Sequence, residues 1–404
     1  MNSNATLTVK VIRVVLICTL VFSLSVPTMA RAQSPWPPVC QESSLPSHDP
    51  KFPEPQLILI CIPPNWNGTL VVYAHGYAPP QAPLALPTDP LALTAPQALL
   101  PQGFAFATTS YHKNGYAVEQ ARKDVNRLVK QFKHLVPPGS LQKVLLIGAS
   151  EGGLIVTMLL ERHPDKYDGA LALCGPLGGA PAEIKYLSDF RAVFDYFFPG
   201  VFSFGATDVP LNAFQDWETV YVPTISAAIA SNPGATAQLF NVTGAALDPA
   251  DPTTAATTSV RILFYNIWGT NDLIATAGGQ PYDNRATVYA GSLDDVALNA
   301  GVERLQSDPR ARSYLRRFYQ PTGELERPLV ALHNTLDPDV PFQHELIYSS
   351  RVADESNSAF LTVLPVFRYG HCNFTPEEVL QAFSLLVTQA QAGEQGPEDE
   401  GDDD

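Results

Sequence analysis

The sequence predicts an α/β fold, a mostly parallel sheet covered by helices on both faces, with a large inserted cap. Strand-like apolar runs alternate with helix-like segments, and this alternation stops at about Gly175 and resumes at about Arg327. Strands that alternate with helices are typical of a parallel sheet buried on both faces. The chain of 404 residues, 45% of them hydrophobic, is long enough to bury a core of this size.

Before the break, five strands and two helices are expected. The strands are expected at 57–62, 69–76, 103–111, 143–149 and 167–175, and the helices at 118–135 and 152–162. The longer helix is indicated by the spacing of Val125, Leu128, Val129 and Phe132. The proline-rich stretches 33–55 and 77–101 predict irregular chain.

After the break, strands are expected at 327–334 and 359–366 and helices at 341–353 and 376–390. We therefore assign 33–175 and 327–393 to the catalytic domain and 176–326 to an inserted cap or lid. The cap is rich in aromatic residues, most of which are expected to form its own core. These are Phe190, Phe194, Tyr196, Phe197, Phe198, Phe202, Phe204 and Trp217.

Both ends of the chain carry distinct segments. Residues 1–32 have the features of a secretory signal: Lys10 and Arg13, an apolar run over 14–26, and a small-x-small site ending at Ala32. The apolar run is too short for a membrane anchor, so we expect a secreted or periplasmic protein. The last eleven residues, 394–404, contain seven acids and no base, which predicts a disordered tail.

Charge and cysteine content narrow the function classes. A net charge of −15 argues against nucleic acid as a partner, because phosphates would be repelled. No metal cluster or cofactor loop is apparent, so neither a metal nor a cofactor is expected. Cys40, Cys61, Cys174 and Cys372 remain after signal cleavage, and an even number in an exported chain favours disulfides. Sequence alone does not choose among the three possible pairings.

Ser150 is the candidate nucleophile. The segment 148–152 reads Gly-Ala-Ser-Glu-Gly, which fits G-x-S-x-G, with a strand before it and a helix after it. Glycine tolerates the tight turn that this motif requires. The following helix directs its first amides at developing negative charge. The alternative is an ordinary loop serine.

A serine hydroxyl needs a base, and His371 is the candidate. It follows the expected strand 359–366 and precedes the last helix. The other histidines fit less well, because they lie in the lead-in, on or beside helices, or too early among the sheet elements. Of these, His112, His134 and His163 are expected at the surface. His75 is expected to be a buried structural residue that binds loop amides.

An acid must orient the imidazole. Asp337 follows the strand 327–334 and precedes the helix that begins near Pro341. Asp339 is the main alternative, and Asp272, after an apolar run in the cap, is a weaker one. Two backbone amides are expected to stabilise the oxyanion, those of Glu151 and Tyr77.

The order Ser150, Asp337, His371, with His75-Gly76 upstream, resembles the α/β-hydrolase superfamily over 57–175 and 327–390. The resemblance implies a Ser-His-Asp hydrolase with a covalent acyl intermediate. The Gly-x-Ser-x-Gly-Gly form and the segment "HNTLDPDVP" are similar to the esterase and prolyl-oligopeptidase-like branches.

Cys372 directly follows His371. In tannases and feruloyl-esterase-like enzymes a cysteine at this place bonds one just before the serine, but here Ala149 stands there. Because Cys174 ends the next expected strand, we expect a Cys174–Cys372 bridge, which leaves Cys40–Cys61. The presence of Ala149 where those enzymes have a cysteine argues against a tannase-like substrate specificity.

These observations favour a secreted serine carboxylic ester hydrolase that acts on small-molecule or polymeric esters without a stable membrane anchor. The alternative is a secreted prolyl-oligopeptidase-like or aminopeptidase-type peptidase, which would need carboxylates to hold a substrate amino terminus. The cap offers Glu183, Asp189, Asp195 and Asp216. A third reading is a binding protein on a hydrolase fold. The sequence does not identify the ester, its chain length or the oligomeric state.

Overall fold

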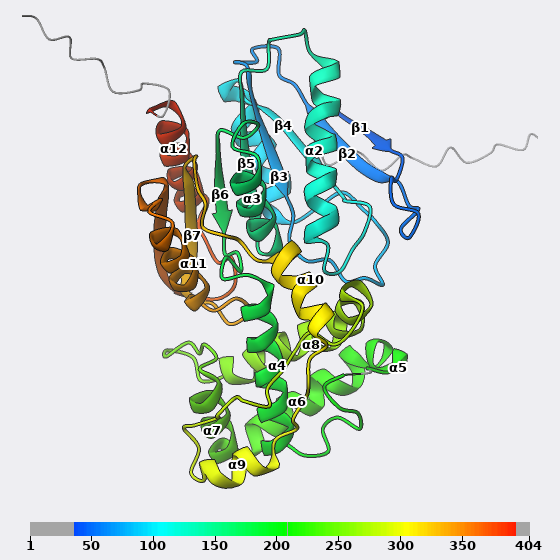
Figure 1. The fold of residues 1–404 in the computed structure, drawn as a ribbon, viewed down its shortest axis with the longest axis vertical. Helices are drawn as coiled ribbons and strands as arrows, with labels where there is room; N and C mark the ends of the chain where they lie inside the picture. The colour runs from blue at the N-terminus through cyan, green and yellow to red at the C-terminus, as the bar shows by residue number, and fades with distance from the viewer. Residues whose placement is uncertain (1–35, 208, 393–404) are drawn as a thin grey trace, which may run out of the picture. The chain divides into compact units, whose positions relative to one another are not determined.

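An eight-stranded sheet forms the centre of the fold (Figure 1). This computed structural model describes residues 36–207 and 209–392. The expected signal segment 1–32 and the acidic tail 394–404 lie outside the described residues. The strands are β1 (Cys40–Leu45), β2 (Gln56–Cys61), β3 (Thr69–Ala74), β4 (Ala105–Thr109), β5 (Lys143–Ala149), β6 (Gly169–Leu173), β7 (Leu329–Leu336) and β8 (Leu361–Tyr369).

The order of the strands in the sheet is β1-β2-β4-β3-β5-β6-β7-β8. All neighbours from β4 to β8 are parallel, whereas β2 runs antiparallel to both β1 and β4. The predicted mostly parallel sheet is therefore confirmed. This order, with helices on both faces, is the α/β-hydrolase fold.

Two layers of helices cover the sheet. One face packs against α2 (Val118–Leu135), α3 (Glu151–Arg162) and α11 (Gln343–Asp354), and the other against α1 (Pro90–Leu99) and α12 (Pro376–Ala392). Because both faces are covered, the central strands have no polar side. The segment Val144–Ile147 of β5, for example, is buried throughout.

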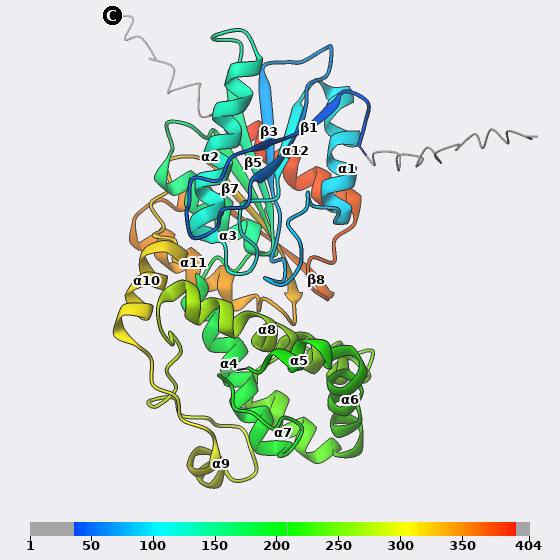
Figure 2. The same cartoon turned by 90° about the vertical axis from the view of Figure 1, so that its right-hand side faces the viewer.

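The segment between β6 and β7 is helical and lies at the end of the sheet where the parallel strands finish (Figures 1 and 2). Its buried side chains form an aromatic core of their own, which contains or contacts all eight aromatic residues named above. The helices are α4 (Ala180–Phe197), α5 (Leu211–Gln215), α6 (Val222–Ser231), α7 (Pro233–Thr243), α8 (Thr254–Ala277), α9 (Asp295–Gly301) and α10 (Pro309–Tyr319), with a π-helical turn over Trp217–Tyr221.

Two expected irregular stretches contain regular elements. The lead-in contains β1, which pairs with β2 so that Cys40 stands directly opposite Cys61, and these residues form a disulfide. The proline-rich stretch contains α1, whose first residue is Pro90 and whose N-cap is Asp89. An aspartate followed by a proline is a typical start of a helix. The many prolines of this stretch led to the expectation of irregular chain instead.

The prediction for His112 was wrong. His112 is 1% exposed. The Oδ2 of Asp124, on α2, accepts the backbone amide of His112 at 2.9 Å and lies 2.5 Å from the Nδ1 of its ring. The His112 ring can be buried because a buried carboxylate is its hydrogen-bond partner. The position of His112 beside a helix does not reveal this partner in the sequence.

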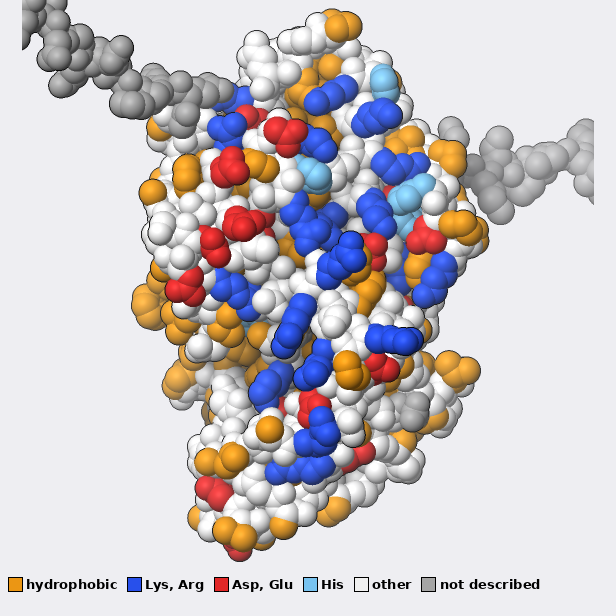
Figure 3. All heavy atoms as spheres, viewed as in Figure 1, with side chains coloured by type: hydrophobic (Ala, Val, Ile, Leu, Met, Phe, Trp, Pro, Cys, Tyr) orange, Lys and Arg blue, Asp and Glu red, His pale blue; other side chains and the backbone are white. Residues whose placement is uncertain are grey.

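The charge of the chain is unevenly distributed. Lys and Arg side chains gather in a band on one face, over α2 and α10 (Figure 3). The exposed cations of these two helices are Lys123, Lys130, Lys133, Arg310, Arg312, Arg316 and Arg317. This face therefore carries a basic band although the net charge of the whole chain is −15. Across residues 36–207 and 209–392, no helix has the length and apolar character needed to cross a membrane.

Candidate active site

Ser150 occupies a strained turn between β5 and α3. Its φ and ψ are 56° and −124°, a conformation that costs a residue with a side chain about 1–3 kcal/mol. The turn also requires two glycines. A Cβ on Gly148 would lie 2.1 Å from the carbonyl oxygen of Gly152, and a Cβ on Gly152 would lie 2.0 Å from that of Ala74. This close packing presents the Ser150 hydroxyl at the end of the sheet.

The structure brings Ser150, His371 and Asp337 together. The His371 Nε2 lies 2.9 Å from the Ser150 Oγ, and its Nδ1 lies 2.8 Å from the Asp337 Oδ2. In the neutral imidazole, Nδ1–H donates to Asp337 while Nε2 accepts from the serine hydroxyl. The three residues follow β5, β8 and β7, whose ends lie at the same edge of the sheet.

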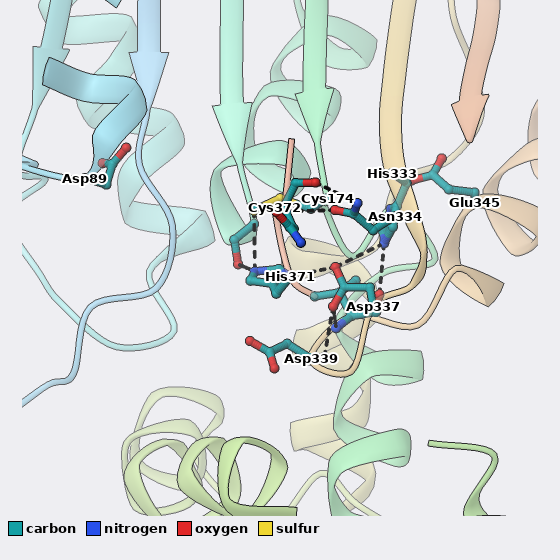
Figure 4. Close-up of a disulfide and its surroundings, with 12 residues drawn as sticks. Asp89, Cys174, His333, Asn334, Asp337, Asp339, Glu345, His371 and Cys372 are labelled. Atoms are coloured by element: carbon teal, nitrogen blue, oxygen red, sulfur yellow. Dashed lines mark hydrogen bonds and ion pairs between the residues drawn. A yellow bond between two sulfur atoms is a disulfide. The ribbon is translucent and has the colours of Figure 1, made fainter. Parts of the chain in front are cut away.

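The two alternative acids have other partners. Asp339 forms an ion pair with Arg261 of α8, whose Nε lies 2.7 Å from its Oδ1. Asp272 lies on α8 and not after a strand, and it pairs with Lys113 at 2.8 Å. Both therefore hold the cap helix α8 to the catalytic domain, and Asp337 is the carboxylate placed at His371 (Figure 4).

The Asp337 carboxylate is fixed from behind. Its Oδ1 accepts the backbone amides of Asp339 and Val340 at 2.9 and 3.0 Å, and it is 1% exposed. The carbonyl of Val340 in turn lies 2.9 Å from Nε2 of the buried His333, whose Nδ1 is 2.8 Å from Glu345. Burial alone would lower the pKa of His333, but the hydrogen bond and charge of Glu345 outweigh it and raise that pKa.

Asn334 is a positioning residue that the sequence reasoning missed. Its side chain accepts the backbone amide of Asn373 at 2.9 Å and donates to the Asn373 carbonyl at 3.0 Å. This paired contact ties the loop that carries His371 to β7 (Figure 4). The signal available in the sequence was an asparagine within a strand that begins with an apolar run, because such an asparagine needs partners for its amide when it is buried.

A disulfide joins Cys174 to Cys372 across 198 residues of chain. Cys174 directly follows β6, and Cys372 directly follows His371. Both residues have positive φ, 47° and 49°, which is rare for residues with a side chain. The covalent bond therefore holds two strained backbone positions next to His371. The structure thus contains the two disulfides that were expected, Cys174–Cys372 and Cys40–Cys61.

The backbone at the expected oxyanion site lies against Ser150. A Cβ on Gly76 would lie 3.0 Å from the Ser150 Cβ, so the loop after β3 passes Ser150 at contact distance. Glu151 begins α3, where amides lack partners within the helix. The His75 ring stacks on Tyr111 at 4.1 Å and its Nδ1 lies 2.7 Å from the Gly76 carbonyl, so this ring shapes the loop.

Of the four cap carboxylates named above, Glu183 lies at the site. It lines a small space that also contains Ser150, and its Oε2 is 2.9 Å from His344 Nε2. Burial, reinforced by the charge of Asp337, raises the pKa of Glu183 well above its ordinary value. The other three pair within the cap: Asp189 with Lys185 and two tyrosine hydroxyls, Asp195 with Arg191, and Asp216 with Asn212.

Comparisons with known proteins find distant relatives. No family model matches the chain. A lysosomal Pro-X carboxypeptidase from Homo sapiens is 35% identical over 78 residues, which are 19% of this chain and 16% of the relative. The matched segment thus spans about a sixth of that protein. An o-phthalyl amidase from Xanthobacter agilis is 23% identical over 427 aligned positions, which cover 87% of this chain and 88% of the relative.

Solved structures give low overall similarity. An esterase from Pyrococcus furiosus is 12% identical with a TM-score of 0.46, covering 90% of this chain and 96% of that one. An acylaminoacyl peptidase from Pyrococcus horikoshii is 10% identical with a TM-score of 0.43, covering 88% and 41%. The α/β-hydrolase fold of this chain is identified by its own strand order.

The pH dependence of Ser150 reactivity follows from the surroundings of His371. Burial alone would lower the pKa of His371, but the charges of Asp337 and Asp339 and the hydrogen bond to Asp337 outweigh it and raise the pKa to about 9. Only the neutral imidazole accepts the serine proton. The rate at which a fluorophosphonate modifies Ser150 is therefore expected to rise about tenfold per pH unit until about pH 9. Asp339→Asn removes a charge that raises this pKa, so its profile should move to lower pH. An unshifted profile would show that Asp339 does not act on His371.

The Cys174–Cys372 disulfide is expected to affect reactivity more than the other disulfide. Closing loops of 198 and 21 residues restricts the unfolded chain by roughly 5 and 3 kcal/mol. Removing both cysteines of the longer loop should also displace His371, and a shift of about 1 Å can cost about a hundredfold in rate. The double variant Cys40→Ala/Cys61→Ala is the matched control: it should melt earlier but keep its labelling rate. Equal labelling rates in both double variants would contradict the positioning role.

Proposed function

We propose that this protein is a serine carboxylic ester hydrolase that works through an acyl-enzyme intermediate. The observation that carries the proposal is the hydrogen-bonded series Ser150–His371–Asp337 on the strained turn after β5. A serine becomes a competent nucleophile when a base within about 3 Å takes its proton and an acid orients that base.

The proposed reaction has two halves. The His371 Nε2 takes the Ser150 proton as Oγ attacks the carbonyl carbon, and the amides of Glu151 and Tyr77 stabilise the resulting oxyanion. The bond to the alcohol breaks and His371 donates its proton to the departing oxygen. A water molecule then attacks the acyl-enzyme and gives a proton to His371. The bond between the acyl carbon and Oγ breaks, and His371 returns this proton to Oγ, which releases the acid and restores Ser150.

An ester substrate is favoured by the apolar surroundings of the site. A cavity of about 610 Å³ opens beside Ser150, and its walls are mostly aliphatic and aromatic. Cavities of this volume and character hold neutral, drug-sized groups. The substrate class is therefore a small-molecule ester, or an ester group of a polymer that reaches this cavity, and not a nucleic acid.

A peptidase that cleaves after an amino-terminal residue is the second candidate, and Glu183 favours it. A carboxylate beside Ser150 provides a partner for a substrate ammonium group. The buried position of Glu183 raises its pKa, and an ammonium group bound next to it would favour the ionised form. A binding protein on a hydrolase fold is the third candidate, and it predicts an unreactive Ser150.

We further propose that the chain is exported after cleavage near Ala32. Two disulfides among the described residues support this, because such bonds persist in oxidising compartments.

Ser150 is expected to be the residue that a fluorophosphonate probe modifies. Ser150→Ala should abolish labelling and reduce kcat for p-nitrophenyl esters by about 10⁴- to 10⁶-fold, because no other group supplies the nucleophile. The Asp337→Asn variant should also lose most of its kcat, whereas the Asp272→Asn variant should keep a nearly normal kcat. Peptide mapping of the labelled wild-type protein identifies the modified serine. Labelling at another serine would refute the assignment, and no labelling at all would favour the binding-protein candidate.

Glu183→Gln separates the ester and peptide candidates, because the amide keeps the size of the side chain and removes its charge. For an ester hydrolase, kcat/KM for neutral p-nitrophenyl esters should stay within about threefold, and aminoacyl p-nitroanilides should be poor substrates of the wild type. For an aminopeptidase, kcat/KM for the anilides should fall by about 10²-fold or more in the variant, as expected for the loss of a buried charge pair.

A further inference from the structure

Two spaces of very different size meet at Ser150. The larger, of about 610 Å³, lies between α1, α12 and the ends of the central strands. The smaller, of about 50 Å³, lies beneath the cap and is lined by side chains of α2, α3 and α4 together with Tyr265. Gly76 and Tyr77 belong to the loop after β3 that borders the larger space, and Tyr77 also borders the smaller one.

His371 borders only one of the two spaces. It lines the larger cavity together with Cys372, whereas the smaller space contains Ser150 and Glu151 without His371. In the mechanism proposed above, the imidazole hands its proton to the leaving group. The leaving group must therefore lie on the side of the serine that His371 faces, and the acyl group must lie on the other side.

We infer, on the basis of the proposed function, that the larger cavity binds the leaving group and the smaller space binds the acyl group. The preferred substrates are then esters of a short carboxylic acid with a large, neutral, apolar alcohol or phenol. The acyl group is short because a space of about 50 Å³ holds only a few non-hydrogen atoms, a single water molecule needing about 10–15 Å³ of such a cavity.

The walls of the larger cavity determine the chemistry of the leaving group. From α1 they include Leu91, Ala95 and Ala98, and from α12 they include Val379, Leu380 and Phe383. The carboxylate among the lining residues, Asp89, accepts a hydrogen bond from the Tyr73 hydroxyl at 2.9 Å and caps α1 through the Ala92 amide at 3.0 Å.

No lysine or arginine lines the larger cavity within the described part of the chain. A leaving group that carries a carboxylate, such as the carboxy-terminal residue of a peptide, would be desolvated there without a cation. A neutral alcohol or phenol meets no such cost.

The inference is tested with two series of esters. The acyl series holds the leaving group constant: p-nitrophenyl acetate, butyrate and octanoate. The alcohol series holds the acid constant: methyl, octyl and 1-naphthyl acetate. We expect kcat/KM to fall beyond butyrate in the acyl series and to rise with alcohol size in the other. A preference for octanoyl over acetyl esters would overturn the inference.

A substitution in the cavity wall assigns the effect to this cavity. Ala98→Trp places a large ring in the cavity, and Gln97→Trp adds the same ring to the exposed side of α1 as a control. Ala98→Trp should lower kcat/KM for 1-naphthyl acetate by about 10- to 100-fold and leave methyl acetate within about twofold, whereas Gln97→Trp should change neither. If Ala98→Trp instead lowers kcat/KM for p-nitrophenyl octanoate much more than for p-nitrophenyl acetate, the two groups are placed the other way round.

A binding measurement separates this inference from the proposed function. The Ser150→Ala protein should bind 1-naphthol saturably, as followed by naphthol fluorescence, and adding Ala98→Trp should abolish that binding. Absence of saturable binding would overturn the inference while leaving ester hydrolysis intact. If the wild type hydrolyses no ester and fluorophosphonate does not label Ser150, the proposed function itself fails, and the inference fails with it.

Discussion

The contact between the turn after β5 and the end of β3 is the constraint on which the site depends. Gly152 packs so closely against the Ala74 carbonyl that no side chain fits between them. This contact forces Ser150 into its strained conformation, and the loop after β3 then passes the Ser150 side chain at Gly76. The serine, the start of α3 and the candidate oxyanion amides are thus positioned by one backbone approach. Strain of this kind persists only where the surrounding packing overdetermines it.

The base and acid depend on a second set of contacts, made by polar side chains. His371 stands on a loop that is held by Asn334 through its amide and by Cys174 through a disulfide. Asp337 is held by two backbone amides, and His333 fixes the far side of that loop. These supports come from β7 and the loop after it and, through Cys174, from the end of β6, so the positions of His371 and Asp337 depend on two neighbouring strand ends.

The cap contributes charge and enclosure. Arg261 and Asp272 of α8 pair with Asp339 and Lys113 of the catalytic domain, which joins the cap to both sides of the site. Asp339 raises the pKa of His371 and Arg261 lowers it, so the two members of this ion pair act on His371 in opposite directions. The larger cavity, in contrast, lies between α1 and α12, so in our proposal the large apolar group is selected by helices of the catalytic domain.

The sequence by itself determined the alternating α/β organisation, the helix over 118–135, and the candidates Ser150, Asp337 and His371. Periodicity and the G-x-S-x-G turn are local properties, and a central strand buried on both faces must be apolar along its whole length. The start of α1 at Asp89 and Pro90 was also a local signal, although the proline-rich stretch was expected to be irregular. The edge strand β1, the burial of His112 and the support from Asn334 were decided by the tertiary structure. Each depends on a partner distant in the chain: Cys61 for β1, Asp124 for His112, Asn373 for Asn334. The same reason explains why the sequence ranked Asp339 and Asp272 as rivals of Asp337: only folding pairs them with Arg261 and Lys113.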